Sequence, residues 1–280
     1  MAHPRGRKAG RPLDPDSIGT RAALSKVEGR NLLGSHQKCW LWGRNVVLET
    51  LRADTWPVLE LHMAGTLAAE DVEAARQLAE RRGIPVKVQA AARLEQLCHA
   101  PEHQGYLAKM GPFPYADAEM LLADRPPAPL YAVLDSIQDP HNFGAVVRSA
   151  EVFGLDAIFI AEREQVGVTT AVARASVGAV SRVPIARVAD LVILAVRLKA
   201  AGVALVAASE KAENLITAHD FRGPTAIVLG SETHGIRPAL VERCDALVRI
   251  PQHGRIGSLN AAAAAAVVFY EARRQRAQGR

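Results

Sequence analysis

The sequence has 280 residues, a formal net charge of +5 at pH 7 and a pI near 9.3, so we expect one or two domains that are each long enough to bury a core. No apolar run is long enough to span a bilayer, and the basic first residues lack the apolar stretch of a secretory signal, which predicts a soluble, cytoplasmic protein without a membrane partner. The basic balance is a weak indication of an acidic partner such as nucleic acid.

Residues 1–36 combine Arg and Lys with Pro and Gly and show no sustained apolar period. This composition predicts a disordered basic tail, which is suited to pairing with RNA phosphates. A solubilising extension without a binding role is an equally good interpretation of the same residues.

A folded domain is predicted from residue 37 to residue 111. Helices are expected at 43–51, 69–82 and 91–99, and strands at 58–63, at 86–88 and after Gly105, which together predict a small α/β unit. Near its end, the turn His103-Gln104-Gly105 is able to present hydrogen-bond donors to a ligand, although a histidine beside a turn is more often structural.

Residues 112–129 are rich in proline and predict an interdomain linker. From residue 130 to residue 280, strands and helices alternate. The expected strands are 130–134, 157–160, 183–185, 203–208, 226–229 and 247–250, and the expected helices are 143–153, 188–201, 238–243 and 261–274. This alternation predicts a mostly parallel sheet with helices on both faces, in which ligands bind at the carboxyl ends of the strands.

The cysteines, Cys39, Cys98 and Cys244, are far apart and odd in number, and their spacing does not suit a metal site. Well-separated cysteines predict reduced thiols rather than a disulfide framework. We therefore expect no metal.

The first strand-to-loop junction of the second domain is the stretch from Leu134 to Ala150. Asn142 is expected to cap the helix that follows, Gly144 allows close approach, and Arg148 is expected to place a cation over the same pocket. An ordinary helix cap followed by a surface arginine is the alternative interpretation of this junction.

Two further junctions complete the pattern. At 227–236 a buried-looking strand ends in a glycine-bracketed loop that holds Glu232, and at 247–260 a strand ends in a loop whose Ser258 and Asn260 stand where a helix begins. Serine and asparagine are preferred helix caps, and the exposed N–H groups of a helix start favour an anion. The glycine-rich signatures of nicotinamide and nucleoside-triphosphate sites are absent from the sequence.

In this order, the three junctions resemble the motifs of the SpoU/TrmH family of RNA ribose 2′-O-methyltransferases, within the SPOUT superfamily. The resemblance covers roughly residues 130–271. The matching residues are Asp139-Pro140, Asn142, Gly144 and Arg148 in the first motif, Gly230-Ser231-Glu232 and Gly235 in the second, and Ile250-Pro251, Gly254 and Ser258-Leu259-Asn260 in the third. The family usually has a glycine directly after the glutamate, where this sequence has Thr233-His234.

The front domain adds to this resemblance. The stretches Gly43-Arg44-Asn45, with Leu48-Glu49, and His103-Gln104-Gly105 are similar to the small RNA-binding domain of the subgroup that modifies 23S ribosomal RNA. The resemblance therefore implies methylation of a ribose 2′-hydroxyl, most simply at a guanosine of 23S rRNA. A tRNA ribose methyltransferase, or a ribosome-assembly protein that binds RNA without catalysing, are the alternatives.

For the architecture, the resemblance implies a deep trefoil knot in the parallel-sheet domain, which forms the pocket for S-adenosylmethionine, and a homodimer with this pocket near the subunit interface. It also implies that backbone groups of Gly230, Ile250 and Leu259 hold the cofactor. The alanine run at 261–266 fits such a pocket because small side chains let backbones approach closely, although alanine is also simply a strong helix former.

For the chemistry, the resemblance assigns roles to Asn142, Arg148, Glu232, Ser258 and Asn260. Lowering the pKa of an arginine from above about 12 to near neutrality would cost roughly 7 kcal/mol. We therefore interpret Arg148 as a guanidinium that grips RNA phosphate and stabilises the developing alkoxide, rather than as the general base. Asn142 is then expected to orient Arg148 and the ribose, Glu232 to steer Arg148 or the substrate, and Ser258 and Asn260 to shape the third loop.

Overall fold

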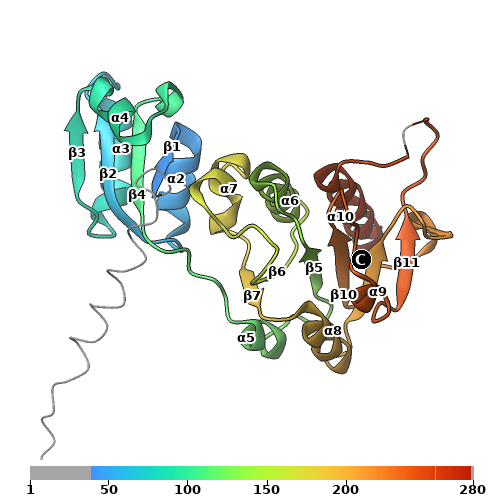
Figure 1. Ribbon diagram of the computed structural model, residues 1–280. Coiled ribbons are helices and arrows are strands. Elements are labelled where there is room, and N and C mark those ends of the chain that lie inside the picture. The colour runs from blue at the N-terminus through green and yellow to red at the C-terminus, as the bar shows by residue number, and fades with distance from the viewer. Residues whose placement is uncertain (1–38, 256, 279–280) are drawn as a thin grey trace, which may run out of the picture. The chain divides into compact units, whose positions relative to one another are not determined.

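The computed structural model describes residues 39–255 and 257–278 (Figure 1). The basic segment 1–36, for which the sequence predicts a disordered tail, lies outside the described residues. All elements below belong to the unit that spans residues 37–280.

The front domain is built on a four-stranded sheet with the order β1-β4-β2-β3. Only β2 and β3 are parallel to one another. The strands are β1 (Trp40–Trp42), β2 (Val58–Ala64), β3 (Val86–Gln89) and β4 (Tyr106–Met110), and the helices are α2 (Arg44–Ala53), α3 (Ala69–Glu80), α4 (Ala91–Cys98) and the short η1 (Pro101–His103). The predicted α/β unit is confirmed, but β1 was not predicted because three residues are too few to show a period.

Helix α2 shows why this domain folds as the sequence predicts. Its apolar side chains Val47, Leu48 and Leu51 are buried, whereas Arg44 and Asn45 are exposed. The helix ends where Asp54 adopts a left-handed conformation with φ of 52°. One amphipathic stripe therefore sets both the position and the extent of the helix.

An ionised carboxylate joins three strands of the front sheet. Glu60 accepts hydrogen bonds from Lys87 Nζ at 2.6 Å and Lys109 Nζ at 3.3 Å, and His62 Nε2 lies 3.0 Å from it. The hydrogen bond from Lys87, followed by that of His62, lowers the pKa of Glu60 from 4.5 to about 2. Because this folded-state pKa lies below the unfolded one, the stabilisation is complete above pH 4.5 and is lost as pH falls toward 2.

The variant Glu60→Gln is therefore expected to lower the free energy of unfolding by about 2 kcal/mol at pH 7, allowing for the partial exposure of the group. The difference from wild type should shrink as pH falls below about 4.5. Urea unfolding at several pH values measures the difference. Glu80→Gln is the control, because Glu80 is exposed and its side chain forms no hydrogen bond or ion pair with a described residue. A difference that does not change with pH would contradict this role of Glu60.

The second domain contains a seven-stranded sheet with the order β7-β6-β5-β10-β8-β11-β9, and every neighbouring pair is parallel. The predicted parallel sheet is confirmed. Its strands are β5 (Leu130–Asp135), β6 (Ala157–Ala161), β7 (Ile185–Val188), β8 (Ala204–Ala208), β9 (Asn214–Leu215), β10 (Thr225–Gly230) and β11 (Ala246–Arg249). The helices are α5 (Ala118–Ala123), α6 (Pro140–Val152), α7 (Thr170–Ala175), α8 (Leu191–Ala200), α9 (Pro238–Val241) and α10 (Ala261–Gln278), with the short turns η2 (Ala179–Ser181) and η3 (Ile216–Ala218).

Helices cover both faces of this sheet because its central strands are apolar on both sides. Along β5, Ala132 and Leu134 pack in one core cluster with α6 and α10, whereas Tyr131 and Val133 pack in another with α5, α8 and α9. Figure 1 shows α6 and α10 beside one another. Such continuous apolar runs are typical of parallel strands that are buried on both faces.

Four parts of the structure differ from the prediction here. Helix α7 and strand β9 were not predicted, and β7 begins at Ile185 rather than at Val183. The segment predicted as a linker contains α5, whose Leu122 is buried, and Ala116 N donates to Ile185 O at 2.9 Å beside β7. The proline-rich stretch therefore packs along the edge of the sheet.

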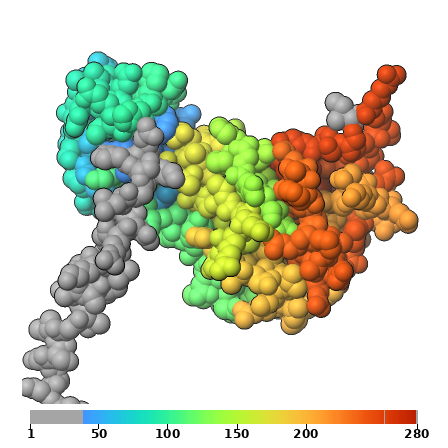
Figure 2. Space-filling model, in the orientation of Figure 1, coloured from blue at the N-terminus to red at the C-terminus, as the bar shows by residue number. Residues whose placement is uncertain are grey.

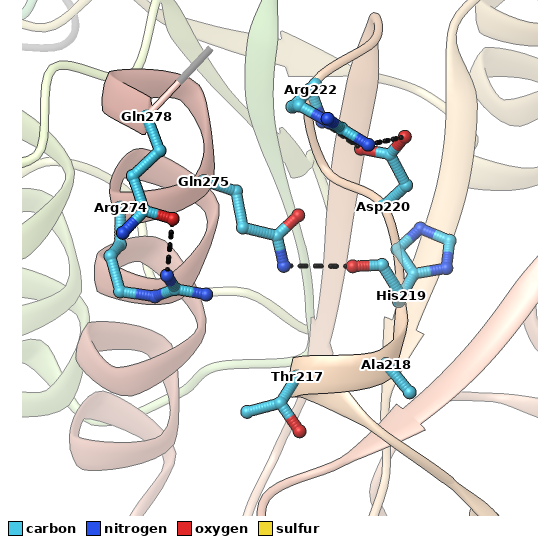
Figure 3. A pocket seen from close by; sticks show the side chains of 8 residues that line it. All are labelled: Thr217, Ala218, His219, Asp220, Arg222, Arg274, Gln275 and Gln278. Carbon is cyan, nitrogen blue, oxygen red and sulfur yellow. Dashed lines mark hydrogen bonds and ion pairs between the residues drawn. The ribbon is translucent and has the colours of Figure 1, made fainter.

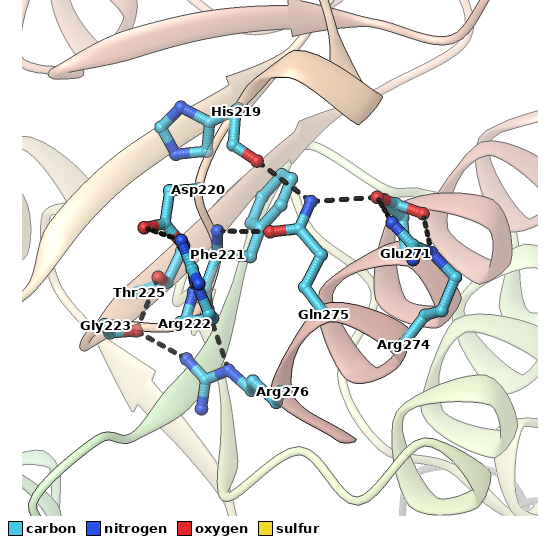
Figure 4. Close-up of polar contacts among 10 residues, drawn as sticks. All are labelled: His219, Asp220, Phe221, Arg222, Gly223, Thr225, Glu271, Arg274, Gln275 and Arg276. Atoms are coloured by element: carbon cyan, nitrogen blue, oxygen red, sulfur yellow. Dashed lines mark hydrogen bonds and ion pairs between the residues drawn. The ribbon is translucent and has the colours of Figure 1, made fainter. Parts of the chain in front are cut away.

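The last turns of α10 are tied to the amino-terminal ends of β5 and β10 by Arg276. Its guanidinium donates to the carbonyls of Ala128 at 2.6 Å, Pro129 at 3.1 Å, Phe221 at 2.9 Å and Gly223 at 2.6 Å. Figure 4 shows its contacts with the loop before β10. These bonds satisfy carbonyls that precede two central strands, and they hold the last turns of the helix against the start of the sheet.

Candidate active site

Side chains from all three predicted junctions meet at Glu232. Its Oε1 accepts from Asn142 Nδ2 at 3.1 Å, from Ala261 N at 3.1 Å and from Asn260 Nδ2. Asn260 Nδ2 also donates to Asn142 Oδ1 at 3.0 Å. One carboxylate thus joins α6, the loop after β10 and the start of α10, which are far apart in sequence.

The helix starts on either side of this cluster are capped differently from one another. Asn260 caps α10 as predicted, because its Oδ1 accepts from Ala262 N at 3.0 Å and from Ala263 N at 3.3 Å. Asn142 is not the cap of α6: Asp139 accepts from His141 N at 2.9 Å and occupies that position. Asn142 lies within the first turn, so its amide is available to Glu232.

The loop that carries Glu232 is closed by its own backbone. Ser231 N donates to Gly235 O at 3.2 Å, and Gly235 N donates to Ser231 O at 2.9 Å. A Cβ on Gly230 would overlap the backbone of Gly235, which itself has φ of 67°. The unusual Thr233-His234 pair lies at the tip of this turn, where it leaves the position of Glu232 intact.

Two cavities lie on either side of Glu232. The larger, of about 580 Å³, is lined by Leu229, Gly230, Ile236, Leu247, Ser258 and Leu259 among others, and the smaller, of about 180 Å³, by Ser136, Ile137, Gln138, Asp139 and Asn142. Glu232 and Ala261 line both. The arrangement suits two ligands that meet at one carboxylate.

The larger cavity fits S-adenosylmethionine in size and chemistry. Its volume lies within the range of about 300 to 1,000 Å³ that small-molecule sites occupy. Its apolar walls suit an adenosine, and the carboxylates of Glu210 and Glu242 suit the positive charges of the ligand. Of the predicted cofactor-binding residues, Gly230 and Leu259 line this cavity, whereas Ile250 does not and packs against the hydrophobic core.

The structure does not bring Arg148 to the cluster. Arg148 is exposed on α6, and its side chain has no hydrogen bond or ion pair with another described residue. Six residues of helix separate it from Asn142, which corresponds to about 9 Å along the axis and about 240° around it. Asn142, Glu232 and Asn260 therefore form one cluster within the chain, Ser258 lines the larger cavity, and Arg148 lies apart.

Asp135 is a buried site residue that the sequence analysis missed. It lies at the end of β5 with 1% exposure, and its two oxygens accept from Arg237 N and Arg237 Nε, each at 2.8 Å. The hydrogen bond to Asp135 raises the pKa of Arg237. This pair fixes the loop after β10 to the neighbouring strand β5. In the sequence, the feature that could have pointed to Asp135 is its position directly after the apolar run 130–134.

The third loop projects from the domain in Figures 1 and 2, and its described residues 251–255 and 257–260 are exposed. It connects β11 to α10 and ends at Asn260, beside the cluster. A projecting loop in this position is suited to contact a large substrate.

A separate cavity of about 430 Å³ lies beside the end of α10 (Figure 3). Its arginines are already paired, Arg222 with Asp220 and Arg274 with Glu271. It contains none of the predicted site residues, so we do not assign the chemistry to it.

Over the described ranges, no group of three or more His, Cys, Asp and Glu side chains is arranged to hold a metal ion. Within the same residues, no helix combines the length and apolar character needed to cross a membrane.

Two family models match the chain. The model described as the SpoU rRNA Methylase family matches residues 129–270, and the model described as RNA 2′-O ribose methyltransferase substrate binding matches residues 40–116. Together they cover both folded domains.

Among relatives, a protein of Bacillus subtilis strain 168, described as a putative TrmH family tRNA/rRNA methyltransferase, is 34% identical over 245 residues, which are 86% of this chain and 98% of the relative. A protein of Mycolicibacterium smegmatis, described as an uncharacterized tRNA/rRNA methyltransferase, is 38% identical over 271 residues, which are 95% of this chain and 86% of the relative.

Solved structures agree with these matches. The SpoU methyltransferase AviRb from Streptomyces viridochromogenes, in complex with S-adenosylmethionine, has a TM-score of 0.74 and 26% identity, with 90% of this chain and 98% of that chain covered. The S-adenosylmethionine-bound rRNA methyltransferase from Sinorhizobium meliloti has a TM-score of 0.73 and 25% identity, with 91% and 95% covered. With the three junctions joined at Glu232 beside a cavity that fits the cofactor, the chain belongs to the SpoU/TrmH family of RNA methyltransferases, which use S-adenosylmethionine.

Proposed function

We propose that this protein methylates a ribose 2′-hydroxyl of RNA, and that its target is a guanosine of 23S rRNA. The observation that carries the proposal is the position of Glu232 and Ala261 on both cavities, since a methyl donor and a nucleotide bound there would meet at this wall. The match of the front domain to a 2′-O-ribose substrate-binding model supports ribose as the acceptor. The names of the relatives, which include both tRNA and rRNA, favour tRNA as the second candidate substrate.

S-adenosylmethionine supplies an already activated methyl group, so the protein has to align the acceptor and help it lose a proton. Glu232 holds the amides of Asn142 and Asn260 in fixed orientations. Asn142 lines the smaller cavity, where its amide is placed to orient a ribose hydroxyl. Ser258, at the wall of the larger cavity, shapes the loop around the cofactor.

In this proposal Arg148 grips an RNA phosphate at a position apart from the Glu232 cluster of the same chain. Its exposed guanidinium has no carboxylate partner among the described residues, so its charge and its planar fork are available to RNA. The forked geometry matches two phosphate oxygens at once, which lysine is unable to reproduce.

Arg148→Ala is therefore expected to reduce kcat/KM for RNA by about 100-fold or more, and Arg148→Lys to restore only a small part of it. Single-turnover methyl transfer between pH 6 and pH 9, together with cofactor affinity, measures both variants. Cofactor affinity should stay at the wild-type value. An Arg148→Lys variant with near-normal activity across this pH range would exclude the phosphate fork.

The function itself is tested by transfer of labelled methyl from S-adenosylmethionine to total cellular RNA, beside Arg148→Ala. A 2′-O-methyl group removes the nucleophile for strand cleavage, so the site is mapped by its resistance to alkali. One resistant linkage in 23S rRNA is the expected result. Label confined to tRNA would show that the substrate is tRNA and not 23S rRNA. Cofactor binding without label in either naked RNA or ribosomal particles would favour an RNA-binding protein without catalysis.

We also propose that the protein is a cytoplasmic homodimer, with a trefoil knot around the cofactor pocket. Large apolar side chains are exposed near the contact of α6 with α10: Val152 is 66% exposed and Tyr270 is 55% exposed, and Tyr270 packs edge-on against Phe153. Exposed apolar groups that cluster in this way favour a partner surface.

Tyr270→Arg is expected to convert the dimer into a monomer, because it places a charge in the proposed interface. Sedimentation equilibrium measures the change. Ile193→Arg is the matched control, since Ile193 is 56% exposed on α8, which packs on the other face of the sheet. A wild-type protein that sediments as a monomer would rule out the dimer.

A further inference from the structure

A cavity of about 300 Å³ lies between the front domain and α7, outside the active site. It is lined by Trp42, Asn45, Glu102, Gln104, Arg174 and Val177. The two stretches of the front domain singled out in the sequence meet here, since Arg44 N donates to Gln104 Oε1 at 2.9 Å.

A tryptophan and an arginine are stacked in this cavity. Arg174 Cζ lies 3.4 Å from the ring centroid of Trp42. The guanidinium of Arg174 forms no hydrogen bond or ion pair with a described residue, so its charge is not neutralised by a carboxylate. The guanidinium is half-buried and lines the cavity, and a planar group on its other side would complete a three-layer stack.

The cavity wall also carries hydrogen-bonding groups without protein partners. The side chain of Asn45 is exposed and forms no hydrogen bond with a described residue. Its amide offers both a donor and an acceptor, which suits the edge of a nucleobase. Glu102 adds an acceptor that suits an exocyclic amino group and repels a bare phosphate. The chemistry therefore favours a base over an isolated anion.

The backbone around the cavity holds an unfavourable conformation. Gln104 has φ of 52° and Val177 has φ of 53°. A left-handed backbone conformation is energetically costly for residues other than glycine, and most of all for β-branched residues such as valine. Such strain tends to occur at binding sites, where the surrounding structure enforces it.

The cavity is held rigid, and it is connected to the helix that carries Asn142 and Arg148. Arg182 Nε donates to Glu49 at 3.2 Å, and Thr55 Oγ1 donates to Ser181 O at 2.8 Å, which fixes α2 against η2. On its other side, α7 packs so closely on α6 that a Cβ on Gly144 would lie 2.8 Å from Val172 O.

We propose that this cavity binds one unpaired nucleotide of the RNA substrate, whose base stacks on Arg174 and whose edge is contacted by Asn45. The proposal rests on the proposed function, because it concerns the same RNA. A nucleotide held here would position the RNA relative to α6, and the recognition is of single-stranded rather than duplex RNA, since a stacked base has to leave its helix.

The test uses two fluorescein-labelled single-stranded RNA hexamers, one with all its bases and one abasic, so that length and charge are the same. By fluorescence anisotropy, the wild-type protein is expected to bind the base-bearing hexamer at least about fivefold more tightly, which is the lower end of what one stacked base provides. Arg174→Gln, and also Arg174→Lys, should lose this preference, while Asn45→Ala should weaken it. Arg81→Gln, an exposed arginine that does not line the cavity, should keep it.

Correct folding of the variants is checked by measuring their affinity for S-adenosylmethionine and their melting temperature. Asn45→Ala should leave both unchanged, because the side chain of Asn45 is exposed. In methylation assays, Arg174→Lys should raise KM for RNA at least about fivefold with little change in kcat. Wild-type methyl transfer together with an unchanged base preference in Arg174→Lys and Asn45→Ala overturns the nucleotide site alone. Failure of the wild-type protein to methylate any RNA or particle overturns the proposed function, and this site with it.

Discussion

Replacing Gly230 with alanine is expected to reduce the affinity for S-adenosylmethionine by about 100-fold and to lower the free energy of unfolding by about 3 kcal/mol. A Cβ at this position would overlap the carbonyl group of Gly235 and the amide of Ile236. Both are backbone atoms, so no side-chain rotation relieves the overlap. The closed turn between Ser231 and Gly235 would have to open, and with it the wall of the larger cavity.

Isothermal titration with S-adenosylmethionine and urea unfolding measure the two effects. Gly223→Ala is the matched control, because Gly223 precedes the same strand and a Cβ there would meet nothing within 4 Å. We expect the control to bind the cofactor as the wild type does. Normal cofactor binding by Gly230→Ala would show that this loop does not form the cofactor pocket.

The second large effect is expected for Glu232→Ala, which should lower kcat for methyl transfer by about 100- to 1,000-fold. Three donors converge on one oxygen of Glu232. Its removal leaves the amide of Asn142 and the N–H of Ala261 without this acceptor, and leaves Asn260 Nδ2 with Asn142 Oδ1 alone. The first turns of α6 and α10 would then no longer be held in their positions relative to one another. Glu232→Gln should lose less, because its amide oxygen still accepts hydrogen bonds.

Single-turnover rates with saturating cofactor separate this effect from weakened binding. Glu213→Gln is the control, because Glu213 is exposed and lines neither cavity. If Glu232→Ala kept normal kcat, the carboxylate would serve only to shape the loop, and the shared wall of the two cavities would not be the reaction site.

The sequence predicted the sheet of the second domain well because its central strands carry a strong local signal. Leu130 to Leu134 and Ala226 to Leu229 are apolar runs of strand length, and both are buried on two faces. Short elements carry less information: α7 has six residues and β9 has two, and neither shows a full period. Their positions are set by packing against distant parts of the chain.

The candidate site was predicted in its residue types and partly in its geometry. Glu232 and Asn260 lie where the three ordered junctions placed them. Asn142 was assigned as a helix cap, but Asp139 takes that place, since Pro140 begins the helix directly after it. Arg148 lies apart from the cluster within the chain, because six residues along a helix do not return to the same face, and its role stays a prediction. Asp135 was missed because a lone aspartate at a strand end does not reveal its partner, Arg237.

The connections of Glu232 also constrain how the enzyme is made. Its partners Asn142 and Ala261 are separated by most of the second domain, and β5 pairs directly with β10 across the same interval. During synthesis, a nascent chain that already contains the first two motifs still lacks the amide of Asn260 and the helix that covers the cluster. Translation of α10 is therefore a precondition for activity, and incomplete products are expected to be unable to methylate RNA even where their front domain has folded.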